Sequence, residues 1–423
     1  MNRFLQIFKV PELRNKILIV AGLLVAYRVL AAIPIPGVDA AKLQNYFNSN
    51  QLFGFLNFFS GGGLSNLSVV MLGVGPYITA TIIMQLLTII FPSFKEMYYE
   101  DGARGQAKFN QYARLITVPL ALVQAYGFLS LLIAQKVIDR PDPFSLIRNV
   151  IVIACGSMIA LWLGELITEQ KVGNGISLII LAGIIARLPA SVGTALVSYT
   201  PALLPTYLGF IVVAVFLIGG IVYLNEGERK IPVAYARRVR GNKMYGGAQS
   251  YLPLKVNQAG MIPLIFAISV LLFPQFLASI VNIFSNHWGV VLNNFATGFV
   301  ANQLAYGIVY FSLVFIFTYF YTAITFNPEE VAKNLQRSGG FVPGIRPGEN
   351  TEKFFGSIVN RITLFGAAFL GLIAILPIII QRITGIAVLT ISGTAILIVV
   401  AVALETMRQI DSQLTVREYE GIE

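Results

Sequence analysis

Ten apolar segments of about bilayer length recur along the chain, and they constrain its fold more than any other feature. A transmembrane helix needs about 20 predominantly apolar residues, and these segments reach or approach that length. They lie at residues 17–33, 69–91, 115–134, 147–167, 174–188, 203–224, 258–281, 303–326, 358–380 and 386–404. The chain is 56% hydrophobic and only 12% charged, whereas soluble proteins carry about 25% charged residues. The sequence therefore predicts an all-α polytopic membrane protein with ten transmembrane helices.

Basic residues are distributed unequally over the segments that connect these helices. With the N-terminus inside, 23 of the 30 Lys and Arg residues lie on the cytoplasmic side and 6 outside, with Arg28 in the first span. Because cytoplasmic loops carry an excess of Lys and Arg, both termini are predicted to be cytoplasmic. The N-terminal run faintly resembles a signal peptide, but Arg28 interrupts it and Pro34 and Pro36 follow at once.

The uncharged, proline-containing stretch 189–202 divides the spans five and five. An odd number of spans per half gives the halves opposite orientations, which is inverted-repeat geometry with the working site at their interface. The predicted parts are an amphipathic cytoplasmic segment, an N-terminal half, an external hinge loop, a C-terminal half with two long cytoplasmic loops, and a cytoplasmic tail. They comprise residues 1–16, 17–188, 189–202, 203–404 (with loops 225–257 and 327–357) and 405–423.

The segment before the second span, about 58–68, is half-apolar and broken by small residues. It contains Gly61, Gly62 and Gly63 in succession, with serines on both sides. Irregular, polar backbone at membrane depth is tolerated only where protein or a water-filled cavity surrounds it. The pattern predicts a short segment that enters an aqueous cavity and stops a pore. A re-entrant surface loop between two ordinary spans is the alternative that composition leaves open.

Two loops, after the sixth and eighth predicted spans, are too distinctive to be simple connectors. The first holds seven cations, and alternation around Ile231 to Tyr235 predicts a β-hairpin. The second displays Arg346 in a turn made rigid by Pro343 and Pro347. Such basic patches suit RNA phosphates or acidic protein surfaces, with membrane topology alone as the other explanation.

Several functional classes fit the composition poorly. Cys155 and His287 are the only cysteine and histidine, which argues against a His- or Cys-built metal site and a His-dependent triad. We therefore expect no metal and no cofactor. An ion-coupled secondary transporter would also show inverted repeats, but it normally uses a buried carboxylate. No Asp or Glu lies mid-span, and Glu165 is at a helix end. An intramembrane protease would need an Asp dyad or a Ser–His pair within its spans, which the sequence lacks.

Six motifs in order along the chain resemble the SecY/Sec61α family, the channel subunits of protein translocases. The matching stretches are Pro34–Asp39, Phe58–Ser65, Gly75–Thr79, Gly173–Ser177, Leu252–Asn257 and Gly340–Gly348. The resemblance implies two inverted five-helix halves around an hourglass pore, a plug at about 58–68, and a lateral gate between the second and seventh spans. It implies a non-enzymatic channel of the cytoplasmic membrane that moves unfolded secretory polypeptides across and releases membrane segments into lipid. Its implied partners are the SecE and SecG subunits, the SecA motor, the translating ribosome, signal sequences and membrane lipid.

Helical spacing and this resemblance together assign the candidate site residues. Val74 and Ile78, like Ile176 and Ile180, are four apart and share a helix face; an aliphatic ring gates by dewetting. The resemblance adds Ile265 and Ile398, with Val399 as a rival, while ordinary bundle core is the alternative explanation. Amide bonds between membrane helices are worth about 0.6–2 kcal/mol, which suits a releasable gate, although such amides also simply line helix contacts. The sets are the pore ring (Val74, Ile78, Ile176, Ile180, Ile265, Ile398), the plug (Phe59, Ser60, Gly61, Gly62, Gly63, Leu64, Ser65), the lateral gate (Gln85, Gln124, Asn257) and the docking arginines (Arg237, Arg238, Arg240, Arg346).

Overall fold

The computed structural model describes residues 10–36, 63, 67–99, 101–134, 138, 141–197, 201, 204–235, 238–240, 243–245, 249–384 and 393–420. The chain forms two compact units. Unit 1 comprises Met1–Pro201, Ser269–Gln303 and Val402–Glu423, and unit 2 comprises Ala202–Ile268 and Leu304–Ala401. The first boundary, after Pro201, falls within the predicted hinge loop.

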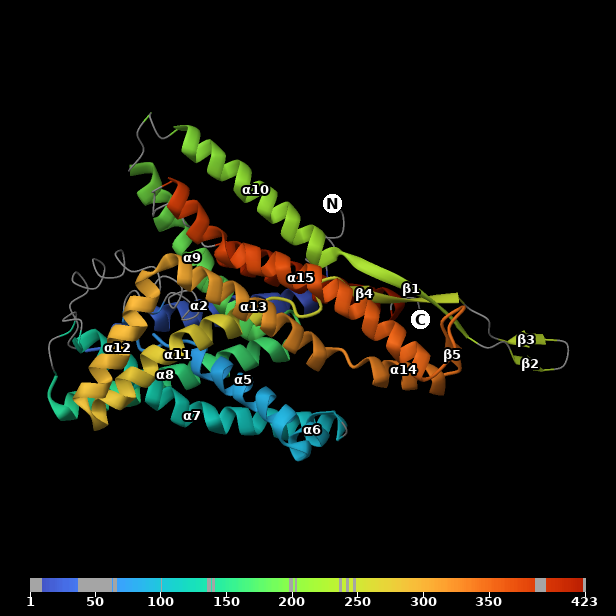
Figure 1. Ribbon diagram of the computed structural model, residues 1–423, viewed down its shortest axis with the longest axis horizontal. Helices are drawn as coiled ribbons and strands as arrows, with labels where there is room; N and C mark the ends of the chain where they lie inside the picture. The colour runs from blue at the N-terminus through green and yellow to red at the C-terminus, as the bar shows by residue number, and fades with distance from the viewer. Residues whose placement is uncertain are drawn as a thin grey trace. The chain divides into compact units, whose positions relative to one another are not determined.

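Helices dominate both units (Figure 1). Those of unit 1 are α2 (Pro11–Ala32), α5 (Gly75–Ile90), α6 (Pro92–Tyr99), α7 (Gly102–Ala134), α8 (Pro143–Glu169), α9 (Gly175–Val197) and α12 (Asn286–Ala301). Those of unit 2 are α10 (Leu204–Glu226), α13 (Gln303–Thr325), α14 (Pro328–Arg337) and α15 (Glu349–Thr384). Two more helices, α11 (Ile262–Phe284) and α16 (Gly393–Glu420), begin in unit 2 and end in unit 1.

Each of the predicted spans overlaps one long helix. In the described part of the chain, 6 helical stretches are long and apolar enough to cross a membrane. They are Pro11–Ala32, Gly102–Ser130, Pro143–Glu169, Tyr207–Glu226, Gln303–Arg337 and Glu349–Leu376. The pair α5 and α6, bent by 114° at Phe91, passes the same test as one broken span. The protein is therefore a helical, multi-pass membrane protein, and the full set of ten spans stays a prediction.

Several helices begin or end away from the predicted boundaries. The span expected from residue 69 begins as a helix only at Gly75, where Pro76 occupies the first turn and needs no hydrogen-bond partner for its nitrogen. The hinge loop expected from residue 189 is helical as far as Val197, because Pro189 removes only one hydrogen bond from a helix in an apolar setting. The segment expected as a tail after residue 404 continues α16 to Glu420. Likewise α2 begins at Pro11, so the last residues of the predicted surface segment belong to it.

The predicted hairpin is confirmed in unit 2. Strand β1 (Glu228–Tyr235) pairs antiparallel with β4 (Gln249–Lys255), and the short β5 (Gly340–Phe341) adds to its other edge. Strands β2 (Arg238–Arg240) and β3 (Lys243–Tyr245) form a separate two-stranded ribbon between them. Ile231 and Val233 are each 3% exposed, and Ile231 belongs to one apolar cluster with Phe355 and Ile358 of α15. Alternation along β1 thus turns one face of the sheet toward α15.

Helix α14 was not predicted, although its sequence carries clear start signals. Asn327 is the N-cap, and its side chain accepts a hydrogen bond from the Glu329 amide at 3.1 Å. Pro328 follows at the first helical position and Glu329 and Glu330 lie in the first turn, where negative charge favours a helix. Together with β5 it lies near the start of α15 (Figure 1).

Candidate functional site

An irregular, largely buried segment precedes α5. Residues 67–74 form consecutive turns instead of the start of a helix. Five of its side chains are 0% exposed: Leu67, Ser68, Val70, Met71 and Val74. Leu67 has φ 41° and Gly73 has φ 51°, and a left-handed conformation costs a leucine about 1–2 kcal/mol. Such a conformation persists only where the surroundings hold it, so the contacts of this segment matter.

Backbone hydrogen bonds fasten the segment to the residues that follow α2. The Ile35 amide donates to the Leu67 carbonyl at 2.8 Å, and the Val69 amide donates to the Ile33 carbonyl at 3.0 Å. These are reciprocal strand-like bonds between parts of the chain that lie far apart in sequence. They satisfy backbone groups that would otherwise be buried without partners.

Helix α8 holds the segment from another side. The Ser157 hydroxyl donates to the Gly73 carbonyl at 2.7 Å. A Cβ at Gly156 would lie 2.0 Å from the Val69 carbonyl oxygen, so only glycine permits this close approach. Apolar side chains complete the packing with α7 and α8 in a cluster that includes Leu67, Met71, Phe128, Leu132 and Ile153. The segment is therefore a rigid support between α2, α8 and α5.

Most of the predicted plug lies outside the described residues, namely Phe59, Ser60, Gly61, Gly62, Leu64 and Ser65. Gly63 is described and buried, and its carbonyl accepts a hydrogen bond from the Ser68 amide at 2.9 Å. A Cβ at Gly63 would lie 2.9 Å from the Val70 carbonyl oxygen. The rigid segment thus overlaps the end of the predicted plug at residues 67 and 68, and the role of the plug stays a prediction.

Four predicted pore-ring residues belong to unit 1. Val74 is the N-cap of α5 and its carbonyl accepts from the Ile78 amide at 3.1 Å, so the two share a helical face. Val74 is 0% exposed and Ile78 is 7% exposed. Ile180 is 1% exposed, while Ile176 is half-buried and lies beside Gly164 of α8.

The corner between α8 and α9 fixes the start of the helix that bears Ile176 and Ile180. The Asn174 side chain accepts from the amides of Ile176 at 3.1 Å and Ser177 at 3.3 Å, which is an N-cap. The Gly175 amide donates to the Thr168 hydroxyl at 2.9 Å. A Cβ at Gly175 would lie 1.8 Å from the carbonyl oxygen of Gly164, so the corner closes only with glycine there.

The other two predicted ring residues belong to unit 2. Ile265 on α11 is 6% exposed and Ile398 on α16 is 2% exposed, whereas its rival Val399 is half-buried. Convergence of all six side chains on one axis stays a prediction.

The three predicted gate amides make different contacts. Gln124 of α7 donates from Nε2 to the Thr79 hydroxyl of α5 at 3.2 Å. Asn257 donates from Nδ2 to Asn225 Oδ1 at 2.8 Å, within unit 2. The Gln85 Oε1 atom is buried and has no hydrogen-bond partner among the described residues. These contacts leave the gate as a prediction, and they add Thr79 and Asn225 as partners that the sequence did not indicate.

The docking arginines lie in or near the two long loops of unit 2. Arg346 is exposed, and its carbonyl accepts from the Thr351 hydroxyl at 3.0 Å. Gly344 has φ 83° and Gly348 has φ 101°, so the turn around Arg346 depends on glycine at both ends. The backbones of Arg238 and Arg240 lie in β2, and Arg237 lies outside the described residues. In the first turn of α15, Lys353 Nζ lies 2.7 Å from Glu349 Oε1.

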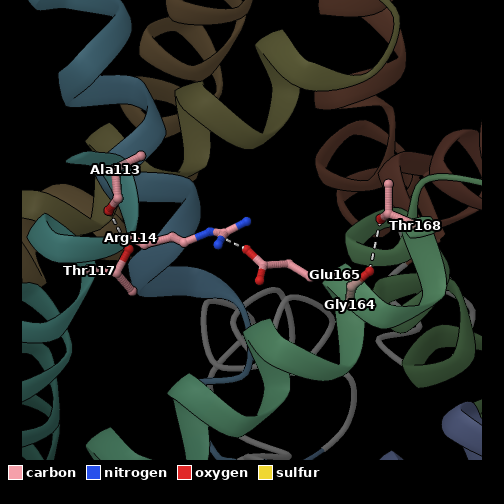
Figure 2. Close-up of polar contacts among 6 residues, drawn as sticks. All are labelled: Ala113, Arg114, Thr117, Gly164, Glu165 and Thr168. Atoms are coloured by element: carbon pink, nitrogen blue, oxygen red, sulfur yellow. Dashed lines mark hydrogen bonds and ion pairs between the residues drawn. The ribbon is translucent and has the colours of Figure 1, made fainter. Parts of the chain in front are cut away.

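An ion pair that sequence reasoning missed joins α7 and α8. Arg114 Nε lies 2.6 Å from Glu165 Oε1, with 51% and 25% of the two side chains exposed. Figure 2 shows the guanidinium of one helix pointing toward the carboxylate of the other. Nearby, the hydroxyls of Thr117 and Thr168 donate to carbonyls of their own helices (Figure 2). Glu165 is thus the paired partner of a cation, not a lone carboxylate of the kind that couples ions.

No group of three or more His, Cys, Asp and Glu side chains that could hold a metal ion occurs among the described residues.

Comparison with known proteins decides the family. The profile of the SecY family matches residues 68–407. The protein translocase subunit SecY of Thermus thermophilus is 42% identical over 431 residues, covering 100% of this chain and 97% of that protein. The subunit of Mycobacterium bovis is 40% identical over 444 residues, covering 100% of this chain and 99% of that protein. The chain belongs to the SecY family.

Solved structures agree with the SecY fold. A structure described as that of a protein-conducting channel has a TM-score of 0.64 and 20% identity, covering 93% of this chain and 90% of that chain. Sec61 in the canine ribosome–channel complex has a TM-score of 0.62 and 19% identity over the same shares. The chain is a protein-conducting channel subunit of the Sec translocase and not an enzyme.

Proposed function

We propose that this SecY-family chain moves unfolded secretory polypeptides across the cytoplasmic membrane and releases membrane segments sideways into lipid. Both termini and the long loops of unit 2 face the cytoplasm, as the distribution of Lys and Arg predicts. The chain acts with SecE and SecG subunits. Two structural neighbours, described as Sec61 in a canine ribosome–channel complex and as the idle yeast Ssh1 complex bound to the yeast 80S ribosome, support a translating ribosome as one partner of the basic loops. SecA is the other.

One observation carries this proposal. The rigid segment 67–74 leads from the predicted plug directly into the α5 face that bears Val74 and Ile78. A conduit for any sequence cannot use fixed hydrogen bonds, so it needs an aliphatic constriction that closes when empty and gates by dewetting. A movable plug beside a fixed support and a row of branched aliphatic side chains suits that task.

In this proposal Arg346 is a docking residue for the SecA motor. Its side chain is exposed on a turn that Gly344 and Gly348 shape. An arginine fork binds a carboxylate with two parallel hydrogen bonds, which suits an acidic protein surface. The amides Gln85, Gln124 and Asn257 bias the gate toward its closed state.

The test is polar substitution of the ring. Ile78→Asn and Ile176→Asn should leave the protein folded and inserted, because water entering the pore hydrates the new amide. Both should pass substrates with defective signal sequences. The matched control is Ile373→Asn, at a core position of α15 with 2% exposure, where an unpaired polar group costs about 1–3 kcal/mol.

The control should accumulate poorly and gain no transport. Poor accumulation of the two ring variants, with no transport of signal-defective substrates, would show that these residues are core and that the pore axis lies elsewhere.

A further inference from the structure

The second half of α16 packs on two separate parts of unit 1. Leu414 is buried with Leu13 of α2, and Ile410 and Ile17 pack against that contact. Gln413 donates from Nε2 to the Lys171 carbonyl in the turn between α8 and α9. Positions 410, 413 and 414 lie on one face of the helix, so a single face makes both contacts.

That turn leads directly into the start of α9. Lys171 has φ 57°, a left-handed conformation, and its carbonyl accepts the hydrogen bond from Gln413. Three residues later the Asn174 side chain caps α9. Gly175 approaches Gly164 of α8 so closely that the turn and the start of α9 must move together. A displacement of the Lys171 carbonyl therefore reaches Ile176, the first predicted ring residue of α9.

The contact of α16 with the turn contains an uncompensated polar group. Thr406 Oγ1 is buried and has no hydrogen-bond partner among the described residues. It lies 3.1 Å from where a Cβ at Gly173 would be, so it packs against the turn. An unpaired buried hydroxyl weakens the contact it sits in, and an isosteric apolar replacement strengthens it.

We propose that Thr406, Ile410, Gln413 and Leu414 form a clamp that positions the start of α9 and so sets how firmly the constriction closes. These are positioning residues that act through the α8–α9 turn. The proposal rests on the proposed role of Ile176 and Ile180 in the pore ring. It predicts that strengthening and weakening the clamp change ion leakage in opposite directions.

The experiment compares Thr406→Val, which removes the unpaired hydroxyl, with Gln413→Met, which removes the donor to Lys171 at similar volume. Each full-length variant is reconstituted with its partner subunits, and leakage of the empty channel is measured in planar bilayers. Hydrogen exchange of residues 172–181 is followed in parallel. We expect Thr406→Val to slow exchange and reduce leakage, and Gln413→Met to speed exchange and raise leakage, each by about threefold or more. Thr415→Val, an exposed threonine of the same helix, is the control and should match the parent.

Unchanged exchange in both variants would overturn the clamp, and so would leakage that moves in the same direction in both. Altered exchange with unaltered leakage would overturn its coupling to the pore. The two proposals fail separately, because Ile78→Asn tests the ring without touching α16. If Ile78→Asn does not leak, the ring is wrong, while the exchange rates still decide whether α16 positions α9.

Discussion

Gly156→Ala tests whether α8 holds the rigid segment in the closed channel. The added Cβ would lie 2.0 Å from the Val69 carbonyl oxygen and 2.7 Å from its carbon, whereas carbon and oxygen atoms normally approach to about 3.3 Å. Both atoms belong to the backbone, so no rotamer change relieves the clash and the segment must move. Overpacking of this kind costs about 1–3 kcal/mol.

If the cost falls on the closed state alone, the open population rises by about 5–150-fold. Ser157→Ala is the milder companion, since it removes the 2.7 Å hydrogen bond to Gly73 and costs about 1 kcal/mol. The assay is ion conductance of the reconstituted complex in planar bilayers, with thermal unfolding in parallel. Gly209→Ala on α10, where nothing lies within 4 Å of a Cβ, is the matched control.

Leakage should rise in the order Gly209→Ala, Ser157→Ala, Gly156→Ala. Parental leakage and parental unfolding temperature in Gly156→Ala would refute the packing of α8 on Val69. A lower unfolding temperature with no leakage in either α8 variant would show that the segment supports the fold and not the seal.

Deletion of residues 60–66 should raise ion leakage while most translocation persists, since glycine and serine side chains bury little surface; unchanged leakage would contradict the plug. Arg346→Glu should abolish SecA-driven translocation in a folded, inserted protein, because it reverses the charge of the docking fork; normal transport in that variant would refute its role. Arg114→Gln and Glu165→Gln should each lower the free energy of unfolding by about 1 kcal/mol, since a half-exposed pair contributes no more than that. The double variant should lose less than the sum in a double-mutant cycle, and strict additivity would show that the pair does not interact.

Hydropathy predicted the helices well and their ends poorly. Hydropathy predicts a span from residue 69, where the structure has turns as far as Val74, because Val69 to Val74 are almost all apolar. Composition also carries no sign that Leu67 adopts a positive φ. The contacts of Gly156 and Ser157 with this segment join parts of the chain that no local pattern connects. By contrast, the β1 hairpin followed from alternation, which one buried face imposes on a strand.

Other features were present in the sequence and were missed. The start of α14 carries an asparagine cap, a proline and two glutamates, which together are a complete start signal. Ile410 and Leu414 share a helix face beyond the last predicted span, so a helical continuation of α16 could have been predicted. The Arg114–Glu165 pair could not have been predicted. Charged residues are common near the ends of transmembrane helices, and only the packing of α7 on α8 brings these two side chains together.

The contacts of the rigid segment and those of the predicted ring differ in kind, and the difference explains how a seal can open without unfolding the protein. Residues 67–74 are held by backbone hydrogen bonds and by a close approach that only Gly156 allows; such contacts are lost abruptly when atoms move apart. The ring consists of aliphatic side chains, whose attraction is nondirectional and re-forms in many arrangements. In the proposed pore, a passing chain would therefore spread Val74 and Ile78 at small cost while the backbone that carries them stays fixed. Substitutions in the support at 67–73 should then alter both stability and leakage, whereas substitutions at the ring residues Ile78, Ile176 and Ile180 should alter leakage alone.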